Sequence, residues 1–141
     1  MNSEIGIGRI KLADNTVLVL KIFVLDIKEL GFSPFGNISF DVKVIGGIAV
    51  ESLSEELRKA MIDKPPAPLE LPKDGWEIID IIDQEPALAE TIVQTSKGKF
   101  RIRVVAEAVM ASRNMMYKSP HNEPIYSLSW ISKISWKPVK E

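Results

Sequence analysis

The sequence has no cysteine, a single histidine and no long apolar run. Without cysteine there can be no disulfide and no cysteine-ligated zinc or iron–sulfur site, and any histidine-dependent site has one possible source. The most apolar window, residues 17–27, is interrupted by Lys21 and Asp26 and is far shorter than the ~20 residues needed to cross a bilayer. The first ten residues lack the pattern of a secretory signal, so we expect a cytoplasmic protein without a membrane span.

The composition is typical of one folded domain. The chain has 141 residues, of which 45% are hydrophobic and 26% charged, which is enough to bury a core without a metal or disulfide. The formal net charge of −1 is unevenly distributed, because residues 1–50, 51–96 and 97–141 carry net charges of 0, −7 and +6. Such asymmetry indicates thirds that fold against each other, an anionic partner for the basic third, or contact with a second copy.

The first third predicts strands. Residues 6–12 and 16–26 form a hairpin around Ala13-Asp14-Asn15, since Asp and Asn tolerate the left-handed conformation of tight turns. A three-residue loop places the following side chains on one apolar face: Ile10, Leu12, Leu18, Leu20 and Ile22. Residues 31–37 read as a loop, and a third strand runs over residues 38–45 and ends at Gly46-Gly47.

One helix is expected at about residues 53–63. Ser52 and Glu55 have the spacing of a capping box, and an apolar face recurs at helical spacing: Leu53, Leu57, Ala60 and Met61. The helix must end before Pro65. Four prolines within residues 64–75 then predict an extended connector inside a single domain that spans residues 1–141.

The second half predicts further strands. Residues 76–83 read as one strand, and a short helical turn starts at Pro86. Residues 91–136 form a three-stranded antiparallel meander with turns at residues 97–98 and 118–124. We expect Thr91 to face Val104 and Tyr117 to face Ile125. This register points the following side chains into the core: Phe100, Ile102, Val104, Ala106, Ala108, Met110, Ser112 and Met116.

A strand over residues 99–116 exceeds the usual length, so it should bend or carry a bulge. The predicted fold class is therefore mainly β (α+β), with a curved antiparallel sheet or small barrel and one packed helix. A β-sandwich is the alternative architecture.

The sharpest functional feature is a row of basic residues on the outer face of the meander: Lys99, Arg101, Arg103, Arg113 and Lys133. Alternate positions on a strand place cations about 6 to 7 Å apart, near the spacing of backbone phosphates. The row therefore predicts an anion or nucleic-acid site. A solvated face that pairs with acidic residues is the alternative, and it is favoured because the aromatic side chains of the meander lie on the other face.

Other motifs select no reaction. Gly6-Ile7-Gly8 precedes a strand and lacks the third glycine of a dinucleotide loop, so it indicates close approach of neighbouring chain. His121 lies in a proline-bounded loop, and an acidic cluster lies earlier in the chain at Asp80, Asp83, Glu85 and Glu90. We expect no enzyme, metal or cofactor. An enzyme becomes credible only if one pocket joins residues 119–123 to the acidic cluster.

A resemblance rests on two stretches, DGWEIIDIIDQEPALAETIVQTSKGKFRIR at residues 74–103 and Asn114-Met115-Met116-Tyr117 with the loop at residues 120–124. These stretches resemble uncharacterised small proteins of thermophilic crenarchaea. The resemblance covers about half of the chain and implies a thermophilic, archaeal source, but it carries no assigned activity or catalytic residue.

Two functional hypotheses follow. The first is a non-enzymatic interaction or assembly protein, a homo-oligomer that pairs through an exposed sheet edge or a remaining apolar face that includes Val109 and Met115. The second is an anion-binding or nucleic-acid-binding module that uses the basic row.

Overall fold

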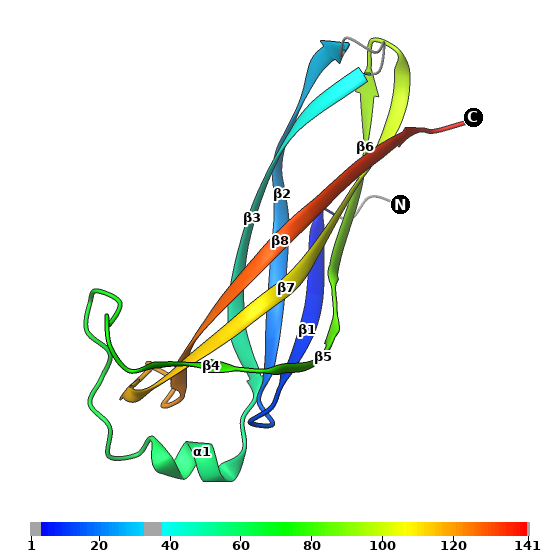
Figure 1. The fold of residues 1–141 in the computed structure, drawn as a ribbon. Helices are drawn as coiled ribbons and strands as arrows, with labels where there is room; N and C mark the ends of the chain where they lie inside the picture. Colours follow the sequence, from blue (N-terminus) through cyan, green and yellow to red (C-terminus); the bar gives the residue numbers. More distant parts are fainter. Residues whose placement is uncertain (1–3, 33–37, 141) are drawn as a thin grey trace.

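The computed structural model describes residues 4–32 and 38–140. In chain order these residues form β1 (Ile5–Leu12), β2 (Val17–Phe32), β3 (Ile38–Ser52), α1 (Glu55–Ala60), β4 (Trp76–Ile79), β5 (Ile81–Glu85), β6 (Ala87–Thr95), β7 (Gly98–Lys118) and β8 (Pro124–Pro138). The predicted mainly-β fold with one helix is therefore confirmed. Figure 1 shows α1 and the β7–β8 loop at the same end of the long strands.

The strands form two antiparallel sheets. The first has the order β3-β2-β1-β5. In the second, β8 pairs with the whole length of β7, while β4 and β6 pair with different halves of its other edge. Apolar side chains from both sheets share one core, so the described strands have the two-sheet arrangement of the sandwich alternative.

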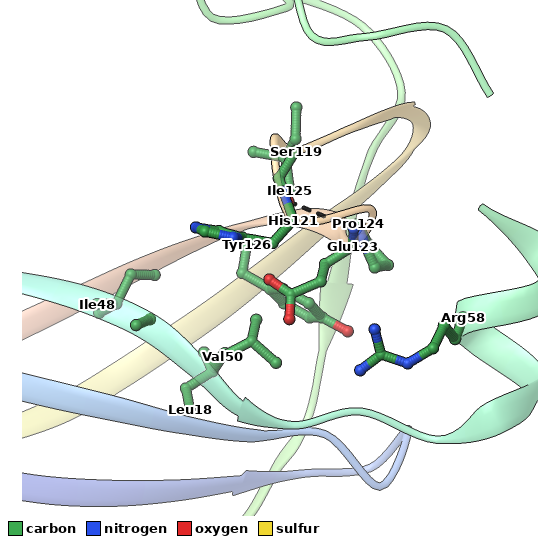
Figure 2. Close-up of a pocket in the computed structure, with 11 residues that line it drawn as sticks. Leu18, Ile48, Val50, Arg58, Ser119, His121, Glu123, Pro124, Ile125 and Tyr126 are labelled. Carbon is green, nitrogen blue, oxygen red and sulfur yellow. Dashed lines mark hydrogen bonds between the residues drawn. The ribbon is translucent and has the colours of Figure 1, made fainter. Parts of the chain in front are cut away.

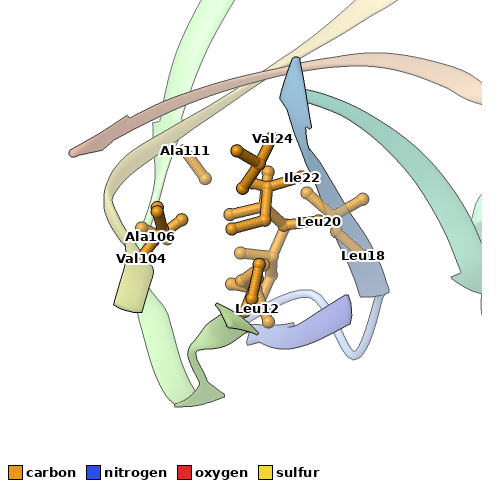
Figure 3. Packing of buried hydrophobic residues seen from close by; sticks show 12 residues of the cluster. Leu12, Leu18, Leu20, Ile22, Val24, Val104, Ala106 and Ala111 are labelled. Carbon is orange, nitrogen blue, oxygen red and sulfur yellow. The ribbon is translucent and has the colours of Figure 1, made fainter. Parts of the chain in front are cut away.

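The first hairpin agrees with its prediction. Ile10 pairs with Leu18 across the turn, and Asn15 has a positive φ of 66°. The predicted apolar face is buried, and Figure 3 shows it packed against the small side chains of β7, including Ala106 and Ala111. Of the expected loop at residues 31–37, residues 31 and 32 belong to β2, and residues 33–37 lie outside the described part.

Two glycines of β1 allow the sheets to approach closely. A Cβ atom on Gly6 would lie 2.6 Å from the carbonyl oxygen of Leu88, and one on Gly8 would lie 2.6 Å from that of Glu85. Both neighbours are backbone atoms, so they cannot rotate away. The Gly6-Ile7-Gly8 motif therefore marks close approach of the chain, as predicted.

The third strand does not end at its glycines. β3 runs on to Ser52, and Gly46 lies beneath the ring of Trp130, which a Cβ atom would meet at 2.6 Å. Trp136 also reaches β3, where its Nε1–H donates to the carbonyl oxygen of Ile38 at 3.1 Å. Side chains of β8 thus cover the opening between the two sheets along β3.

The helix is shorter and more exposed than predicted. It spans Glu55–Ala60, and its N-cap is Ser54, whose Oγ accepts a hydrogen bond from the Leu57 amide at 3.2 Å, in place of the predicted Ser52. The helix has no buried residue, although Met61 directly after it is fully buried. It therefore covers one end of the sheets and contributes little to the core.

The predicted strand at residues 76–83 is two strands. β4 pairs with β7, and the chain then crosses at Asp80 to the first sheet, where β5 pairs with β1. The expected helical turn at Pro86 is wrong, because β6 begins at Ala87 and returns to β7. The proline-rich connector at residues 64–75 touches the strands through an isolated bridge between Pro66 and Lys118.

The meander is present, but its predicted register is wrong. Thr91 pairs with Ile102 in place of Val104, and Ile125 pairs with Asn114 in place of Tyr117. The expected irregularity of β7 is confirmed by a bulge between Ala108 and Met110. The bulge reverses which positions face inward, and it explains why the prediction for two residues is wrong, since Met110 and Met116 are exposed.

Candidate functional site

The basic row is divided by the fold. Lys99, Arg101 and Arg103 alternate with buried residues on the first half of β7, and Lys133 lies on the same outer face of β8. Arg113 follows the bulge and points to the other side of the sheet, toward the β1–β2 turn. The row is therefore a group of four cations, with Arg113 in a different site.

Acidic side chains neutralise part of this row. The Lys133 ammonium lies 3.1 Å from the Glu107 carboxylate, and Arg103 lies 3.9 Å from Glu90. These side chains are all at least one third exposed, so each pair contributes ~1 kcal/mol or less to stability. The pattern is typical of a solvated sheet face, which was the alternative interpretation of the row.

A shallow recess of about 260 Å³ remains on this face, lined by Glu90, Arg101, Arg103, Ser135, Trp136 and Lys137. Lys137 pairs directly with Arg101. The sequence prediction missed Lys137 because the predicted meander ended at residue 136, whereas β8 runs on to Pro138. Continued alternation beyond Lys133 and Ser135 was the signal that would have placed it on the outer face.

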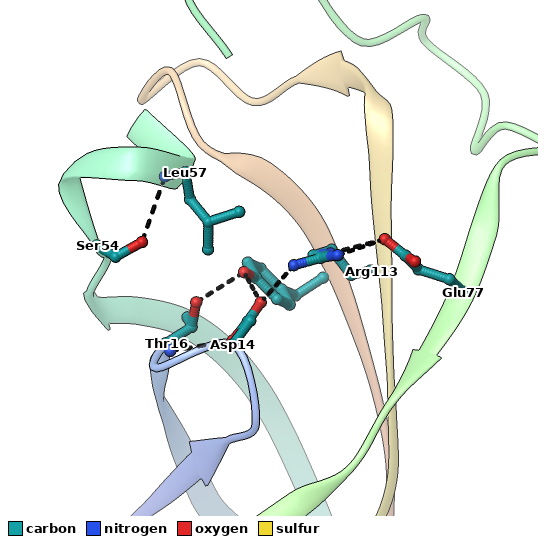
Figure 4. A network of polar contacts seen from close by, with 7 residues as sticks. Asp14, Thr16, Ser54, Leu57, Glu77 and Arg113 are labelled. Carbon is teal, nitrogen blue, oxygen red and sulfur yellow. Dashed lines mark hydrogen bonds and ion pairs between the residues drawn. The ribbon is translucent and has the colours of Figure 1, made fainter. Parts of the chain in front are cut away.

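Arg113 belongs to a polar clamp between the two sheets, formed by Asp14, Thr16, Glu77, Arg113 and Tyr126 (Figure 4). The Arg113 Nη1–H donates to Asp14 at 3.0 Å, and its Nε–H donates to Glu77 at 2.9 Å. The Tyr126 hydroxyl donates to the Asp14 carboxylate at 2.8 Å. The clamp therefore ties the β1–β2 turn to β4, β7 and β8.

The surroundings shift the pKa values of the clamp. Burial acts to raise the pKa of Asp14, but hydrogen bonds from Tyr126, Thr16 and Arg113 outweigh burial and hold it below its ordinary value. Burial raises the pKa of Tyr126, and the nearby Asp14 carboxylate adds to that rise. Asp14 is therefore charged and Tyr126 neutral at pH 7, as a structural ion pair requires.

An open pocket of about 550 Å³ lies beside the clamp, and we call it the end pocket (Figure 2). Its apolar wall includes Leu18, Ile48 and Val50 of the first sheet. Its polar side comes from α1 and the β7–β8 loop, with Arg58, Ser119, His121 and Glu123. None of the four residues of the predicted acidic cluster lines this pocket, so the end pocket does not join residues 119–123 to that cluster.

The first sheet exposes an apolar surface away from the core, which we call the outer apolar face: Ile7, Val19, Phe23, Leu25, Ile45 and Ala49, around Gly47. Ile7 is 54% exposed, Leu25 52% and Ile45 51%. Two charged side chains lie on the same side of these strands: Lys21, which pairs with Ile7 and Gly47, and Arg9, which pairs with Val19. The two residues named in the sequence hypothesis lie elsewhere, since Val109 and Met115 belong to β7.

The described residues contain no helix long and apolar enough to cross a membrane. In comparisons with known proteins, no family model, curated protein or solved structure matches this chain.

Proposed function

We propose that the protein is a non-enzymatic assembly protein that forms a homodimer through its outer apolar face. The observation that carries the proposal is the contrast between the two sheets. Along the outer side of β7 and β8 the alternate positions include Arg101, Arg103 and Lys133, as expected for a solvated sheet. The corresponding side of β1, β2 and β3 carries mainly aliphatic and aromatic side chains.

The apolar side chains lie on both sides of Lys21 and Gly47, which pair with each other across β2 and β3. Phe23 and Ile45 are direct neighbours across β2 and β3, and Val19 and Ala49 are neighbours in the same way. Three strands spaced ~4.8 Å apart and about 20 Å of strand length give this surface roughly 300 Å² in projection. A patch of that size is comparable to the largest exposed apolar patch on a typical monomer, which is often functional.

The surface contains both a recess and projecting side chains. A groove of about 380 Å³ lies over Gly46 and Gly47, and a Cβ atom on Gly47 would meet nothing within 4 Å. Phe23 and Ile45 line the same groove. A two-fold contact brings the same patch of two copies together, so projecting side chains of one copy face the recess of the other. This self-complementary relief favours a second copy over an unrelated partner.

Charge and size are compatible with a dimer. Lys21 has a four-carbon stem that can lie along apolar surface while its ammonium reaches the rim. The rim carries Arg9 and Glu51, which form an ion pair at 3.0 Å. A standard interface buries about 800 Å² per partner, with an apolar centre and a polar rim. The outer apolar face would supply the centre, and the neighbouring charged residues the rim.

The proposal is tested by the mass of the protein in solution at micromolar concentration. We expect a dimer for the native chain and a monomer for Ile7→Asp, because the short aspartate side chain cannot carry its charge to the rim as Lys21 can, and an unpaired carboxylate inside a contact costs several kcal/mol and weakens association about 100-fold or more. Ile131→Asp is the matched control, since Ile131 is 49% exposed on a strand of the other sheet. A monomeric native chain, or equal loss of mass in both variants, would refute the proposal.

The basic row supports a second candidate, binding of an anionic polymer. Arg101 and Lys137 lie side by side in the recess of β7 and β8, which is an arrangement that phosphate groups would fit. Ion pairs to Glu90 and Glu107 reduce the free charge, so we rank this function second. Binding to labelled nucleic acid that falls steeply with salt would support it.

A further inference from the structure

We propose that the end pocket binds a small zwitterionic ligand with an apolar body, such as a short peptide with free ends. This binding activity goes beyond assembly and uses a largely different surface, because only Ile48 and Ala49 line both the end pocket and the groove of the outer apolar face. Ligand binding and the mass of the protein are separate measurements, so the two proposals can fail independently.

The pocket combines an apolar wall with two opposite charges from separate elements. Ile48 and Val50 form part of the wall, Arg58 comes from α1, and Glu123 comes from the β7–β8 loop. Figure 2 shows the guanidinium of Arg58 and the carboxylate of Glu123 both directed toward the open space above the wall. A volume of about 550 Å³ lies within the usual range of small-molecule sites.

The two charges are not used within the described structure. Neither the Arg58 guanidinium nor the Glu123 carboxylate has an ion pair or side-chain hydrogen bond among the described residues. Arg113 provides the contrast, since it contacts the carboxylates of both Asp14 and Glu77. Arg113 is therefore a structural cation, whereas Arg58 remains available to a ligand.

The chemistry of the pair selects the ligand class. A guanidinium binds a carboxylate through two parallel hydrogen bonds, and a carboxylate accepts hydrogen bonds from an ammonium group. A simple anion in the pocket would be repelled by Glu123, and a simple cation would be repelled by Arg58. A ligand that carries both charges satisfies each of them, and its apolar body gains stability from contact with the aliphatic wall.

Local structure holds the polar side of the pocket in place. The Ser119 Oγ accepts hydrogen bonds from the amides of His121 at 3.2 Å and Glu123 at 3.3 Å, and the Ser119 amide donates to the Glu123 carbonyl at 2.8 Å. Tyr126 lines the pocket while its hydroxyl is held by the polar clamp. A preformed loop reduces the entropy cost of binding.

The test uses leucyl-leucine as the probe for the full chain, followed by calorimetry and by methyl NMR signals of Ile48 and Ile125, which line the pocket. Two analogues each lack one charge: N-acetyl-leucyl-leucine has no ammonium, and leucyl-leucine amide has no carboxylate. We expect the dipeptide to bind and each analogue to bind at least about tenfold more weakly, which corresponds to 1.4 kcal/mol.

Two variants test which pocket residue binds the carboxylate of the dipeptide and which binds its ammonium. Arg58→Ala should abolish the preference for the free carboxylate, and Glu123→Gln should abolish the preference for the free ammonium. Lys59→Ala is the control, because Lys59 is an exposed neighbour on α1 that does not line the pocket. The proposal is overturned if the Ile48 signal does not move at about 10 mM dipeptide, where a Kd of about 1 mM gives near saturation. Equal binding of the three probes, or unchanged binding by Arg58→Ala, would also overturn it.

Discussion

Replacement of Asp14 by alanine should destabilise the fold more than any exposed charge substitution, because Asp14 joins the two sheets. Its side chain is only 10% exposed and accepts three hydrogen bonds, from the Thr16 amide, the Tyr126 hydroxyl and Arg113. Tyr126 retains its contact with the Thr16 hydroxyl and Arg113 retains Glu77, whereas the Thr16 amide loses its acceptor. At about 1 kcal/mol per net hydrogen bond, the expected loss is about 3 kcal/mol.

The assay is thermal unfolding followed by circular dichroism. An unfolding entropy of about 2.1 cal/mol/K per residue gives roughly 0.3 kcal/mol/K for 141 residues, so the expected fall in Tm is about 10 °C. Asp41→Ala is the control, since Asp41 is an exposed aspartate on β3 that no described residue pairs with through its side chain, and it should shift the free energy by less than about 0.5 kcal/mol.

The pH dependence gives a second test of the clamp. The folded state lowers the pKa of Asp14 below its ordinary 3.8, so the ionised carboxylate stabilises the native chain above that pH. This stabilisation is lost as the pH falls below 3.8 and through the folded pKa, and the difference between the native chain and Asp14→Ala should shrink there. A loss under about 1 kcal/mol at pH 7, or a difference that persists undiminished at about pH 2, would refute the reasoning.

Three further predictions follow from packing and charge. Gly8→Ala should lower the free energy of unfolding in urea by about 2 kcal/mol, because its Cβ would lie 2.6 Å from a backbone oxygen. Gly47→Ala should change it by less than about 1 kcal/mol, because its Cβ would meet nothing within 4 Å. Equal effects of the two variants would contradict this. Trp136→Phe should lower the free energy of unfolding by about 1 kcal/mol in the same assay, because the indole N–H of Trp136 donates to a carbonyl of β3. An unchanged free energy of unfolding would show that this hydrogen bond does not stabilise the fold. The double variant Arg101→Glu and Arg103→Glu should leave the mass by light scattering unchanged, and salt-sensitive nucleic-acid binding that this variant abolishes would instead favour the second candidate function.

The first hairpin could be predicted because all the necessary information was local. Strict alternation from Ile10 to Ile22 defined the buried face, and Asp14 and Asn15 defined the turn and hence the register. The end of β3 could not be predicted in this way. Gly46 reads as a strand terminator, but it is required because Trp130, far away in sequence, packs onto it.

The candidate sites also contain parts that local sequence predicts and parts that only tertiary packing decides. Alternation placed Arg101, Arg103 and Lys133 correctly on one outer face, but the bulge at Ala108 moved Arg113 to the clamp. No local pattern locates a bulge to one residue, since it depends on how two sheets pack. The end pocket was also out of reach, because its walls come from segments separated by more than sixty positions, and their proximity follows from the tertiary fold.

The most direct test of the outer apolar face uses the absence of cysteine in the native chain. A single thiol introduced by Lys21→Cys lies in the middle of the face, and Ile131→Cys places one on the opposite sheet as a control. With a flexible bis-maleimide at micromolar protein concentration, the account predicts a covalent dimer for Lys21→Cys and monomer for Ile131→Cys. Monomer from both variants, or dimer in equal yield from both, would contradict assembly through this face.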